Sequence, residues 1–225
     1  DYTGAAIQRA GGVDLKLTSQ CDGSFVMVAN RQSSVKDMEQ LVAKKIAVSR
    51  NTIIDFCTDL VLQQARIPLK DVEKVEINKI PLRLEMLMNG KIDATMLPDP
   101  FATIALQNDN FAVVDIEKLD VRVTGIAFHN KSIDEKREAI ESFYRAYNRA
   151  VDILLDEPVS SFHELLIAEV GVPVEFVSHI HLPRYTKASL PQIDDLKKVA
   201  AWLKSQNLVP SDFDIETLLS TKLDL

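Results

Sequence analysis

The most constraining feature of this chain is a pair of strand-to-helix transitions within residues 44–103. One apolar run ends at the polar residues 49–52, a second ends at residues 97–100, and an amphipathic segment follows each of them. In open α/β sheets, ligands bind beyond the carboxyl ends of the strands. The two polar turns are therefore the expected contact points for a small molecule.

Composition limits the classes of partner. The 225 residues are 46% hydrophobic and 26% charged, which suits a globular chain of one large or two small domains. With 26 Lys and Arg against 33 Asp and Glu, the net charge is -7, which opposes nonspecific binding to nucleic acid or anionic lipid. No apolar run approaches the roughly 20 residues that a bilayer-spanning helix needs.

Periodicity predicts an α/β chain whose character changes near residue 128. Runs rich in β-branched and aromatic residues predict strands at 13–17, 24–29, 45–49, 72–77, 92–97, 111–115 and 121–128. Helical spacing of apolar residues predicts helices at 52–65, after Pro81, after Pro100, and at 134–156, 161–170, 192–205 and 215–220. Asn51 carries a side-chain oxygen suited to cap the helix that comes after it.

Two runs of sequence resemble a known family. They are KKIAVSRNTIIDFCTDLVLQQA and KVEINKIPLRLEMLMNGKIDATMLPDPFATIA, and they resemble the middle lobe of bacterial solute-binding proteins. The nearest kin are the nitrate, sulfonate and taurine binders and the group that binds thiamine-pyrimidine precursors. Further matches lie at VTGIAFHNK, at residues 182–185 and at residues 199–203.

The resemblance implies a two-lobed clamp of the class II periplasmic-binding-protein type. Each lobe would be a small α/β unit, and two hinge strands near residues 24–31 and 123–130 would cross between the lobes. Residues 32–122 would then form the inner lobe, and residues 1–31 with 123–225 the outer lobe. The ligand would lie in the cleft between them.

The chain departs from the family pattern at its first residue. Members of the family begin with a strand, a helix and a strand of the outer lobe, whereas Asp1 aligns with a position beyond those three elements. We therefore expect an incomplete outer lobe that exposes an apolar face, which a missing or swapped N-terminal segment would complete.

The first candidate contacts come directly after the strand at 45–49. Ser49, Arg50, Asn51 and Thr52 stand where the amides of a helix N-terminus would point at a ligand, and such amides favour acceptor atoms. The alternative is that these side chains only cap the helix. Resemblance to the family favours ligand contact for Asn51 and Thr52.

The second group of candidates includes Asp99, a carboxylate between two prolines that could receive an amine or amidine. Its alternative role is to cap the helix after Pro100. Asp1, Tyr2 and Thr3 would contact the ligand from the outer lobe. Phe101 could provide an aromatic wall, although core packing is its simpler role.

Cysteine and histidine residues do not indicate a metal site or a cofactor. Cys21 and Cys57 lie far apart, so free thiols are expected, although an oxidising compartment would permit pairing. His179 and His181 would share a face of a strand, but no further ligand has suitable spacing beside them. We expect no metal and no cofactor.

The main functional prediction is an extracytoplasmic solute-binding protein, periplasmic or anchored as a lipoprotein. It would capture a small organic molecule and deliver it to the permease and ATPase of an ABC importer, without catalysis. The alternatives are an enzyme of thiamine-pyrimidine synthesis, whose cysteine-rich metal run is absent here, and the effector-sensing part of a transcription regulator. A sulfonate or nitrate would suit Arg50, whereas a pyrimidine or amine would suit Asp99 and Asp1, and the sequence slightly favours the latter.

Overall fold

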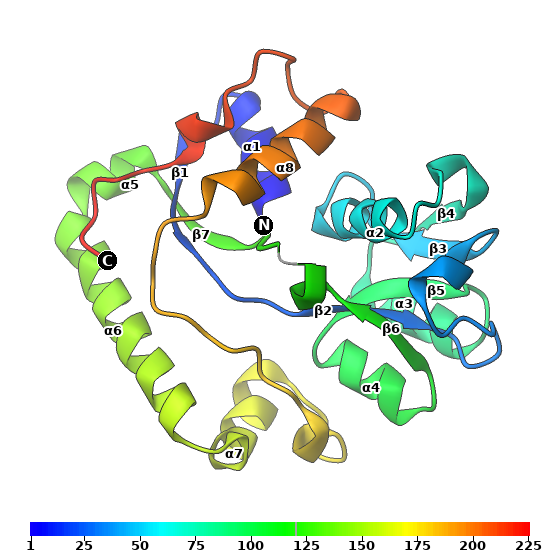
Figure 1. Ribbon diagram of the computed structural model, residues 1–225. Helices are drawn as coiled ribbons and strands as arrows, with labels where there is room; N and C mark the ends of the chain where they lie inside the picture. The colour runs from blue at the N-terminus through cyan, green and yellow to red at the C-terminus, as the bar shows by residue number, and fades with distance from the viewer. Residues whose placement is uncertain (120) are drawn as a thin grey trace. The chain divides into compact units, whose positions relative to one another are not determined.

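The computed structural model describes residues 1–119 and 121–225, and the chain divides into two compact units (Figure 1). Unit 1 comprises Asp1–Gly23, Val121–Pro158 and Pro183–Leu225. Unit 2 comprises Ser24–Asp120 and Val159–Leu182. Each unit is therefore assembled from segments that are distant in the sequence.

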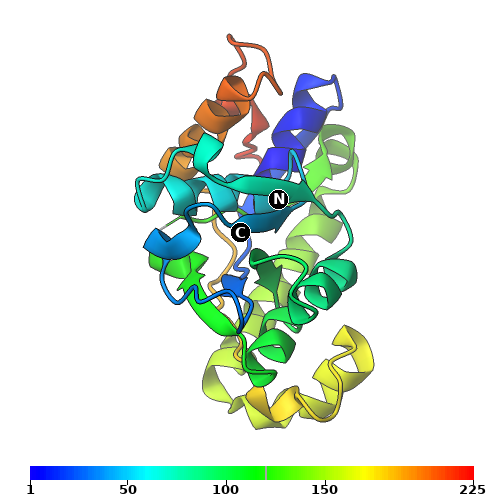
Figure 2. The same cartoon turned by 90° about the vertical axis from the view of Figure 1, so that its right-hand side faces the viewer.

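Unit 2 contains a five-stranded sheet in the order β4-β3-β5-β2-β6 (Figures 1 and 2). The strands are β2 (Phe25–Ala29), β3 (Lys45–Val48), β4 (Glu73–Glu76), β5 (Ala94–Pro98) and β6 (Phe111–Asp115). β3 pairs in parallel with both β4 and β5, whereas β2 is antiparallel to β5 and β6. Because β3, β4 and β5 run in the same direction, their carboxyl ends lie at one edge of the sheet.

Three helices of unit 2 cover this sheet with apolar side chains. They are α2 (Ile53–Gln64), α3 (Ile80–Met88) and α4 (Phe101–Gln107), with 3-10 turns η1 (Met38–Leu41), η2 (Leu69–Asp71) and η3 (Ile116–Leu119). One cluster joins strands to α3 and α4, and its fully buried members are Val28, Ala47, Leu87, Leu97 and Ala105. These predicted strand-helix alternations are confirmed, with ends shifted by a few residues.

Residues 159–182 form a small module with its own core of Leu166, Val172, Val177 and Ile180. The helix predicted at 161–170 is confirmed as a helical run, but the run is not a regular α-helix. A 3-10 turn η4 (Val159–Phe162), one turn of α-helix α7 (His163–Leu165) and a π-helical turn η5 (Leu166–Val170) succeed one another instead. The run ends because Gly171 adopts a left-handed φ of 76°. A last 3-10 turn, η6 (Val177–His179), lies further along the module.

Unit 1 contains the antiparallel pair β1 (Leu15–Gln20) and β7 (Gly125–His129), which has an irregularity between Leu17 and Ser19. The other edge of β1 is covered by later parts of the same unit. Ser220 N–H donates to the Leu17 carbonyl at 3.1 Å, and Gln20 N–H donates to the Ser189 carbonyl at 2.8 Å. This edge is therefore hydrogen-bonded within the described chain.

The helices of unit 1 are α1 (Tyr2–Ala10), α5 (Asn130–Glu135), α6 (Arg137–Asp156) and α8 (Ile193–Ser205), with a 3-10 turn η7 (Ile215–Leu218). The sequence did not predict α1. The single helix predicted at 134–156 is divided, because Lys136 leaves the helical conformation with φ -128°.

The 20-residue helix α6 is amphipathic. Its buried stripe consists of Ile140, Tyr144 and Val151, while Phe143 remains 45% exposed.

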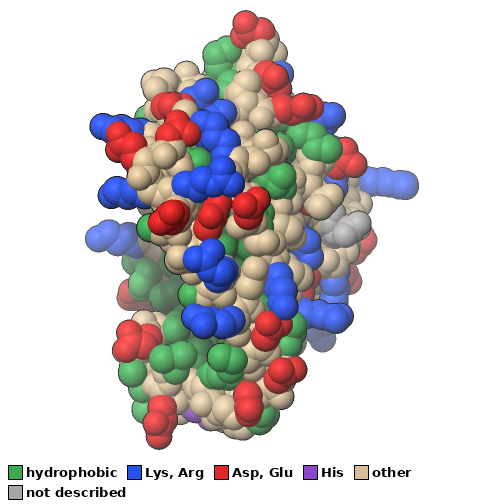
Figure 3. Space-filling model, turned by 90° about the vertical axis from the view of Figure 1, so that its left-hand side faces the viewer, with side chains coloured by type: hydrophobic (Ala, Val, Ile, Leu, Met, Phe, Trp, Pro, Cys, Tyr) green, Lys and Arg blue, Asp and Glu red, His purple; other side chains and the backbone are tan. Residues whose placement is uncertain are grey.

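Figure 3 displays one face of the molecule, where acidic and basic side chains are intermixed with hydrophobic ones. The intermixed charges fit the acidic composition and give no sign of a basic nucleic-acid-binding surface on that face.

Candidate functional site

The turn after β3 begins the candidate site, and Thr52 organises it. The Thr52 Oγ1 accepts a hydrogen bond from Ile54 N–H at 3.2 Å and donates one to the Ser49 carbonyl at 2.7 Å. Thr52 is therefore the N-cap of α2, and the capping role predicted for Asn51 is wrong. Asn51 has a left-handed φ of 63°, whereas an N-cap needs the extended backbone that Thr52 adopts.

Replacing Thr52 by valine should lower the free energy of unfolding by about 1 kcal/mol, because the N-cap oxygen is lost while the side-chain volume is kept. Urea denaturation measures this change. The Thr52→Ser variant retains the hydroxyl and should stay close to the wild type. Equal losses in both variants would show that the hydroxyl does not cap α2.

A buried ion cluster of Lys74, Asp55 and Asp59 stabilises the turn after β3. The Asp55 Oδ2 accepts the Asn51 N–H at 3.1 Å, and the Asp55 Oδ1 lies 2.8 Å from the Lys74 Nζ. Lys74, on β4, also pairs with Asp59 one turn further along α2. The three side chains are only 8–13% exposed, so their attraction is weakly screened. The Asn51 backbone is thereby fixed to β4.

The end of β4 supplies a second polar side chain at this edge. Ser49 Oγ donates to Asn78 Oδ1 at 3.0 Å, which links the turn after β3 to the turn after β4. Arg50 is half exposed and lies 3.8 Å from Glu76, and its Nη2 donates to the Lys74 carbonyl at 3.5 Å. The guanidinium of Arg50 is therefore directed toward β4.

The end of β5 places Asp99 at the same edge of the sheet. The Asp99 Oδ1 accepts hydrogen bonds from the Thr103 N–H at 3.0 Å and the Thr103 Oγ1 at 2.8 Å. This oxygen therefore fixes the first turn of α4, while the Asp99 Oδ2 takes no part in these bonds. Phe101 packs against the buried cluster under α3 and α4, in agreement with a core role.

The remaining predicted residues lie in unit 1, at the start of α1. The Asp1 Oδ1 accepts from Gly4 N–H and from Thr3 Oγ1, both at 2.7 Å, and so caps α1. Tyr2 and Thr3 are fully buried. Burial raises the pKa of Tyr2, the charge of Asp195 raises it further, and its hydroxyl has no partner within the described residues. The phenol stays protonated at neutral pH.

The structure thus brings part of the predicted set together. Ser49, Arg50, Asn51, Thr52 and Asp99 share the carboxyl edge of β3 and β5 in unit 2. Asp1, Tyr2 and Thr3 belong to unit 1.

Sequence reasoning missed two residues at this edge, and one of them had a readable signal. Asn78 directly follows the predicted strand 72–77, and Ser49 ends the predicted strand 45–49. The rule that ligands bind beyond the carboxyl ends of strands therefore identifies Asn78 as well. The side chain of Lys74 gave no such signal, because its partners Asp55 and Asp59 lie on a different element.

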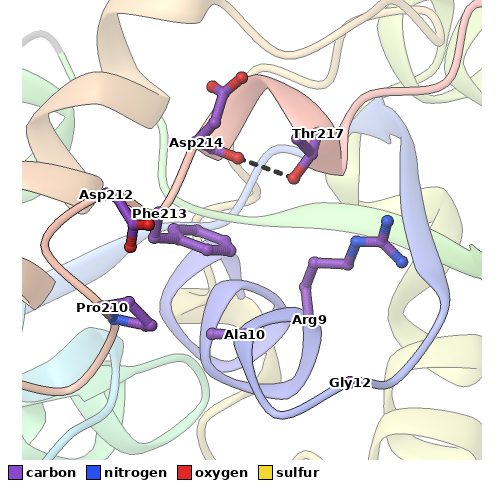
Figure 4. Close-up of a pocket in the computed structure, with 8 residues that line it drawn as sticks. All are labelled: Arg9, Ala10, Gly12, Pro210, Asp212, Phe213, Asp214 and Thr217. Atoms are coloured by element: carbon purple, nitrogen blue, oxygen red, sulfur yellow. Dashed lines mark hydrogen bonds between the residues drawn. The ribbon is translucent and has the colours of Figure 1, made fainter.

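A separate cavity of about 470 Å³ lies in unit 1, between the end of α1 and the segment before and within η7 (Figure 4). Its lining residues are Arg9, Ala10, Gly12, Pro210, Asp212, Phe213, Asp214 and Thr217. Arg9 is paired with Asp14 at 2.5 Å, and Thr217 Oγ1 donates to the Asp214 carbonyl at 2.7 Å. The lining includes none of the predicted site residues.

Residues 1–119 and 121–225 contain neither a candidate metal site nor a candidate membrane-spanning helix. In that part of the chain, no group of three or more His, Cys, Asp and Glu side chains could hold a metal ion. His179 ends a 3-10 turn, so the strand that would place His179 and His181 on one face is not formed there. Cys21 and Cys57 are free thiols. No described helix has the length and hydropathy to cross a bilayer.

Solved structures share this fold at low sequence identity. The periplasmic aliphatic sulphonate binding protein SsuA from Escherichia coli matches with a TM-score of 0.85 and 18% identity, over 100% of this chain and 75% of that chain. The alkanesulfonate-binding protein SsuA from Xanthomonas axonopodis, bound to MOPS, matches with 0.82 and 15% identity, over 97% and 78%. The desulfurization enzyme DSZB matches with 0.64 and 14% identity, over 92% and 77%.

These matches define the fold as that of the two-lobed periplasmic binding proteins. The NMT1/THI5-like family model matches residues 7–161, and the chain belongs to that family. The predicted resemblance to nitrate, sulfonate and taurine binders is therefore confirmed at the level of family and fold. A comparison with curated protein sequences finds no match.

Proposed function

We propose that this chain is the solute-binding component of an ABC-type importer, which captures a small organic molecule outside the cytoplasm and delivers it to a membrane permease and its ATPase. Family membership supports the class of protein. The observation that carries the proposal is the carboxyl edge of unit 2, where the adjacent parallel strands β3, β4 and β5 each lead into a polar turn. Such an edge is a common ligand site in α/β sheets.

The proposed contacts in unit 2 are Ser49, Arg50, Asn51, Thr52 and Asp99, with Phe101 as an apolar neighbour. Asp1, Tyr2 and Thr3 are proposed contacts in unit 1. The proposed lobes are residues 32–122 and residues 1–31 with 123–225. They differ from the compact units chiefly in residues 24–31 and 159–182, which belong to unit 2. Anchoring as a lipoprotein also belongs to the proposal.

An anionic ligand fits unit 2 better than the amine that the sequence slightly favoured. The first amides of the 12-residue helix α2 begin directly after Thr52, and a helix N-terminus favours negative charge. One oxygen of Asp99 is already occupied by Thr103, which leaves this carboxylate less able to receive an amine. The two structural neighbours described as sulfonate binders support the same class of ligand.

Asp99→Asn separates the two ligand classes. If the ligand is anionic, its affinity should stay the same or rise by up to roughly threefold, because a negative charge at the edge is removed. If the ligand is an amine or amino-pyrimidine, its affinity should fall at least tenfold. Isothermal titration calorimetry on the variant and the wild type measures this difference.

The proposal as a whole is tested by native mass spectrometry of protein purified without added ligand. We expect a bound small molecule that is released on denaturation and rebinds in calorimetry. Failure to retain a small molecule, together with no binding of alkanesulfonates, nitrate or amino-pyrimidines, would contradict it.

The second candidate function is enzymatic, because one of the proteins that share the fold is an enzyme. A desulfurization enzyme shares the fold, although its likeness at 14% identity concerns the fold alone. Incubating the identified ligand with the protein and analysing the mixture by mass spectrometry decides the point. Recovery of unchanged ligand is the result expected of a binding protein.

A further inference from the structure

Arg83 is a fully buried cation in unit 2, and the proposed ligand contacts do not include it. Its side chain arises from α3 and is 1% exposed. The Nη1 donates to the Ile77 carbonyl at 2.9 Å and to the Asn78 carbonyl at 3.4 Å, whereas Nε and Nη2 have no hydrogen-bond partner in the described residues.

The positive charge of Arg83 is not balanced by a nearby carboxylate. In the described part of the chain, every buried Asp that forms an ion pair does so with a cation other than Arg83. Burial alone lowers the pKa of Arg83, with no contribution from a neighbouring charge, and an arginine remains protonated nonetheless. An unpaired buried charge is costly, and an apolar residue of similar volume is often neutral or stabilising in its place.

The two hydrogen bonds of Arg83 direct it to the candidate site. Both carbonyls belong to the turn after β4, and Asn78 in that turn accepts a hydrogen bond from Ser49. The guanidinium of Arg83 therefore contacts the backbone of the turn that forms the carboxyl edge at β4, next to β3. The N-terminus of α2 adds partial positive charge to the same edge.

Other charges near this edge are largely paired among themselves. Arg50 lies beside Glu76, and Lys74 pairs with two carboxylates of α2. Asp99 is the acidic side chain at the edge that forms no ion pair in the described residues, and it accepts two hydrogen bonds from Thr103. Glu76 also accepts a hydrogen bond from Asn78 Nδ2 at 3.2 Å, and Arg50 is its ion-pair partner. Arg83 itself forms no ion pair with a carboxylate in the described residues, so its charge is not directly neutralised.

We infer that Arg83 is a specificity-determining residue, whose buried positive charge makes the carboxyl edge of unit 2 select a ligand group that carries negative charge. This inference rests on the proposed function, since it concerns the same edge. Arg83 acts through its electric field and through the Asn78 backbone, without touching the ligand. A nearby low-dielectric interior transmits such a field far better than water does.

The test compares an anion with a neutral molecule of similar shape. Methanesulfonate and dimethyl sulfone differ mainly in charge, and calorimetry gives the affinity of each. Wild-type protein should prefer methanesulfonate. Arg83→Met should weaken methanesulfonate on the order of tenfold and leave dimethyl sulfone within about twofold. Arg66→Met, at an exposed arginine of the same unit, is the matched control and should change neither affinity.

A structural role and an electrostatic role give different results in a second variant. Arg83→Lys keeps the charge but loses the planar fork, so the preference for methanesulfonate should persist within about threefold. If Arg83→Met fails to fold, the comparison of Arg83→Lys with the wild type still tests the inference. Loss of the preference for methanesulfonate in Arg83→Lys would show that the geometry of the side chain matters and not its charge, and would overturn the inference.

The remaining outcomes separate this inference from the proposed function. Equal affinity of the wild type for both molecules overturns the role of Arg83 and leaves a solute-binding protein in place. Binding of neither molecule, nor of a ligand retained in purification, overturns the proposed function and the inference with it. Unchanged thermal stability of Arg83→Met beside a lost preference is the expected combination.

Discussion

Replacing Lys74 by methionine should lower the free energy of unfolding by about 3–5 kcal/mol, because two buried carboxylates lose their shared cation. Asp55 and Asp59 lie one turn apart on α2, and their side chains are 8% and 9% exposed. Neither can reach water without moving the first turns of α2. Urea denaturation with linear extrapolation measures the loss.

Lys45→Met is the matched control on the neighbouring strand. Lys45 lies 3.8 Å from Glu73, and the two side chains are 41% and 67% exposed, so this pair should contribute at most about 1 kcal/mol. Adding Asp55→Asn and Asp59→Asn to the Lys74 variant should recover part of the loss. Equal stabilities for the Lys74 and Lys45 variants would contradict a buried ion cluster under the Asn51 turn.

Gly125→Ala should destabilise unit 1 by about 1–3 kcal/mol, since the new methyl group has no room. A Cβ at this position would lie 2.7 Å from Cε1 of Tyr2 and 2.8 Å from the Ser19 carbonyl oxygen. The first contact is with a fully buried ring and the second is with backbone, so neither can yield cheaply. Thermal and urea unfolding should both report the change.

Gly11→Ala provides the comparison for this prediction. A Cβ at Gly11 would lie 3.4 Å from two carbonyl oxygens of α1, and Gly11 has an ordinary φ of -77°. Its effect should stay within about 0.5 kcal/mol. A Gly125 variant as stable as the Gly11 variant would mean that Tyr2 does not pack on β7.

The strands and helices of unit 2 could be predicted well because each is encoded by the order of apolar and polar residues within its own segment. The strand expected at 111–115 is observed as β6 (Phe111–Asp115), and the strand at 72–77 as β4 (Glu73–Glu76). Alternation of strands and helices was enough to place both candidate turns at the ends of strands. Which strands pair could not be read in the same way: β1 and β2 are neighbours in sequence but belong to different sheets.

The predictions that were wrong or missing depend on contacts between distant segments or on weak local signals, which the pattern within one segment does not reveal. The helix α1 is only nine residues long and buries small side chains such as Ala5 and Ala6, so its apolar face gives no clear signal, and its first turn is capped by Asp1. The positive φ of Asn51 is compatible with its hydrogen bond to Asp55, which Lys74 of β4 holds in place. Arg83 looked like an ordinary helical arginine, since its burial depends on how α3 packs beneath the turn after β4.

The most direct test of the central claim is an NMR titration of backbone amides with the molecule that co-purifies with the protein. We expect the largest shift changes at Ser49, Thr52, Ile54 and Asn78. If the largest changes occur around Arg9, Gly12 and Thr217 and the strand edge of unit 2 is unchanged, the ligand binds in the cavity of Figure 4 and the proposed site at the strand edge is wrong.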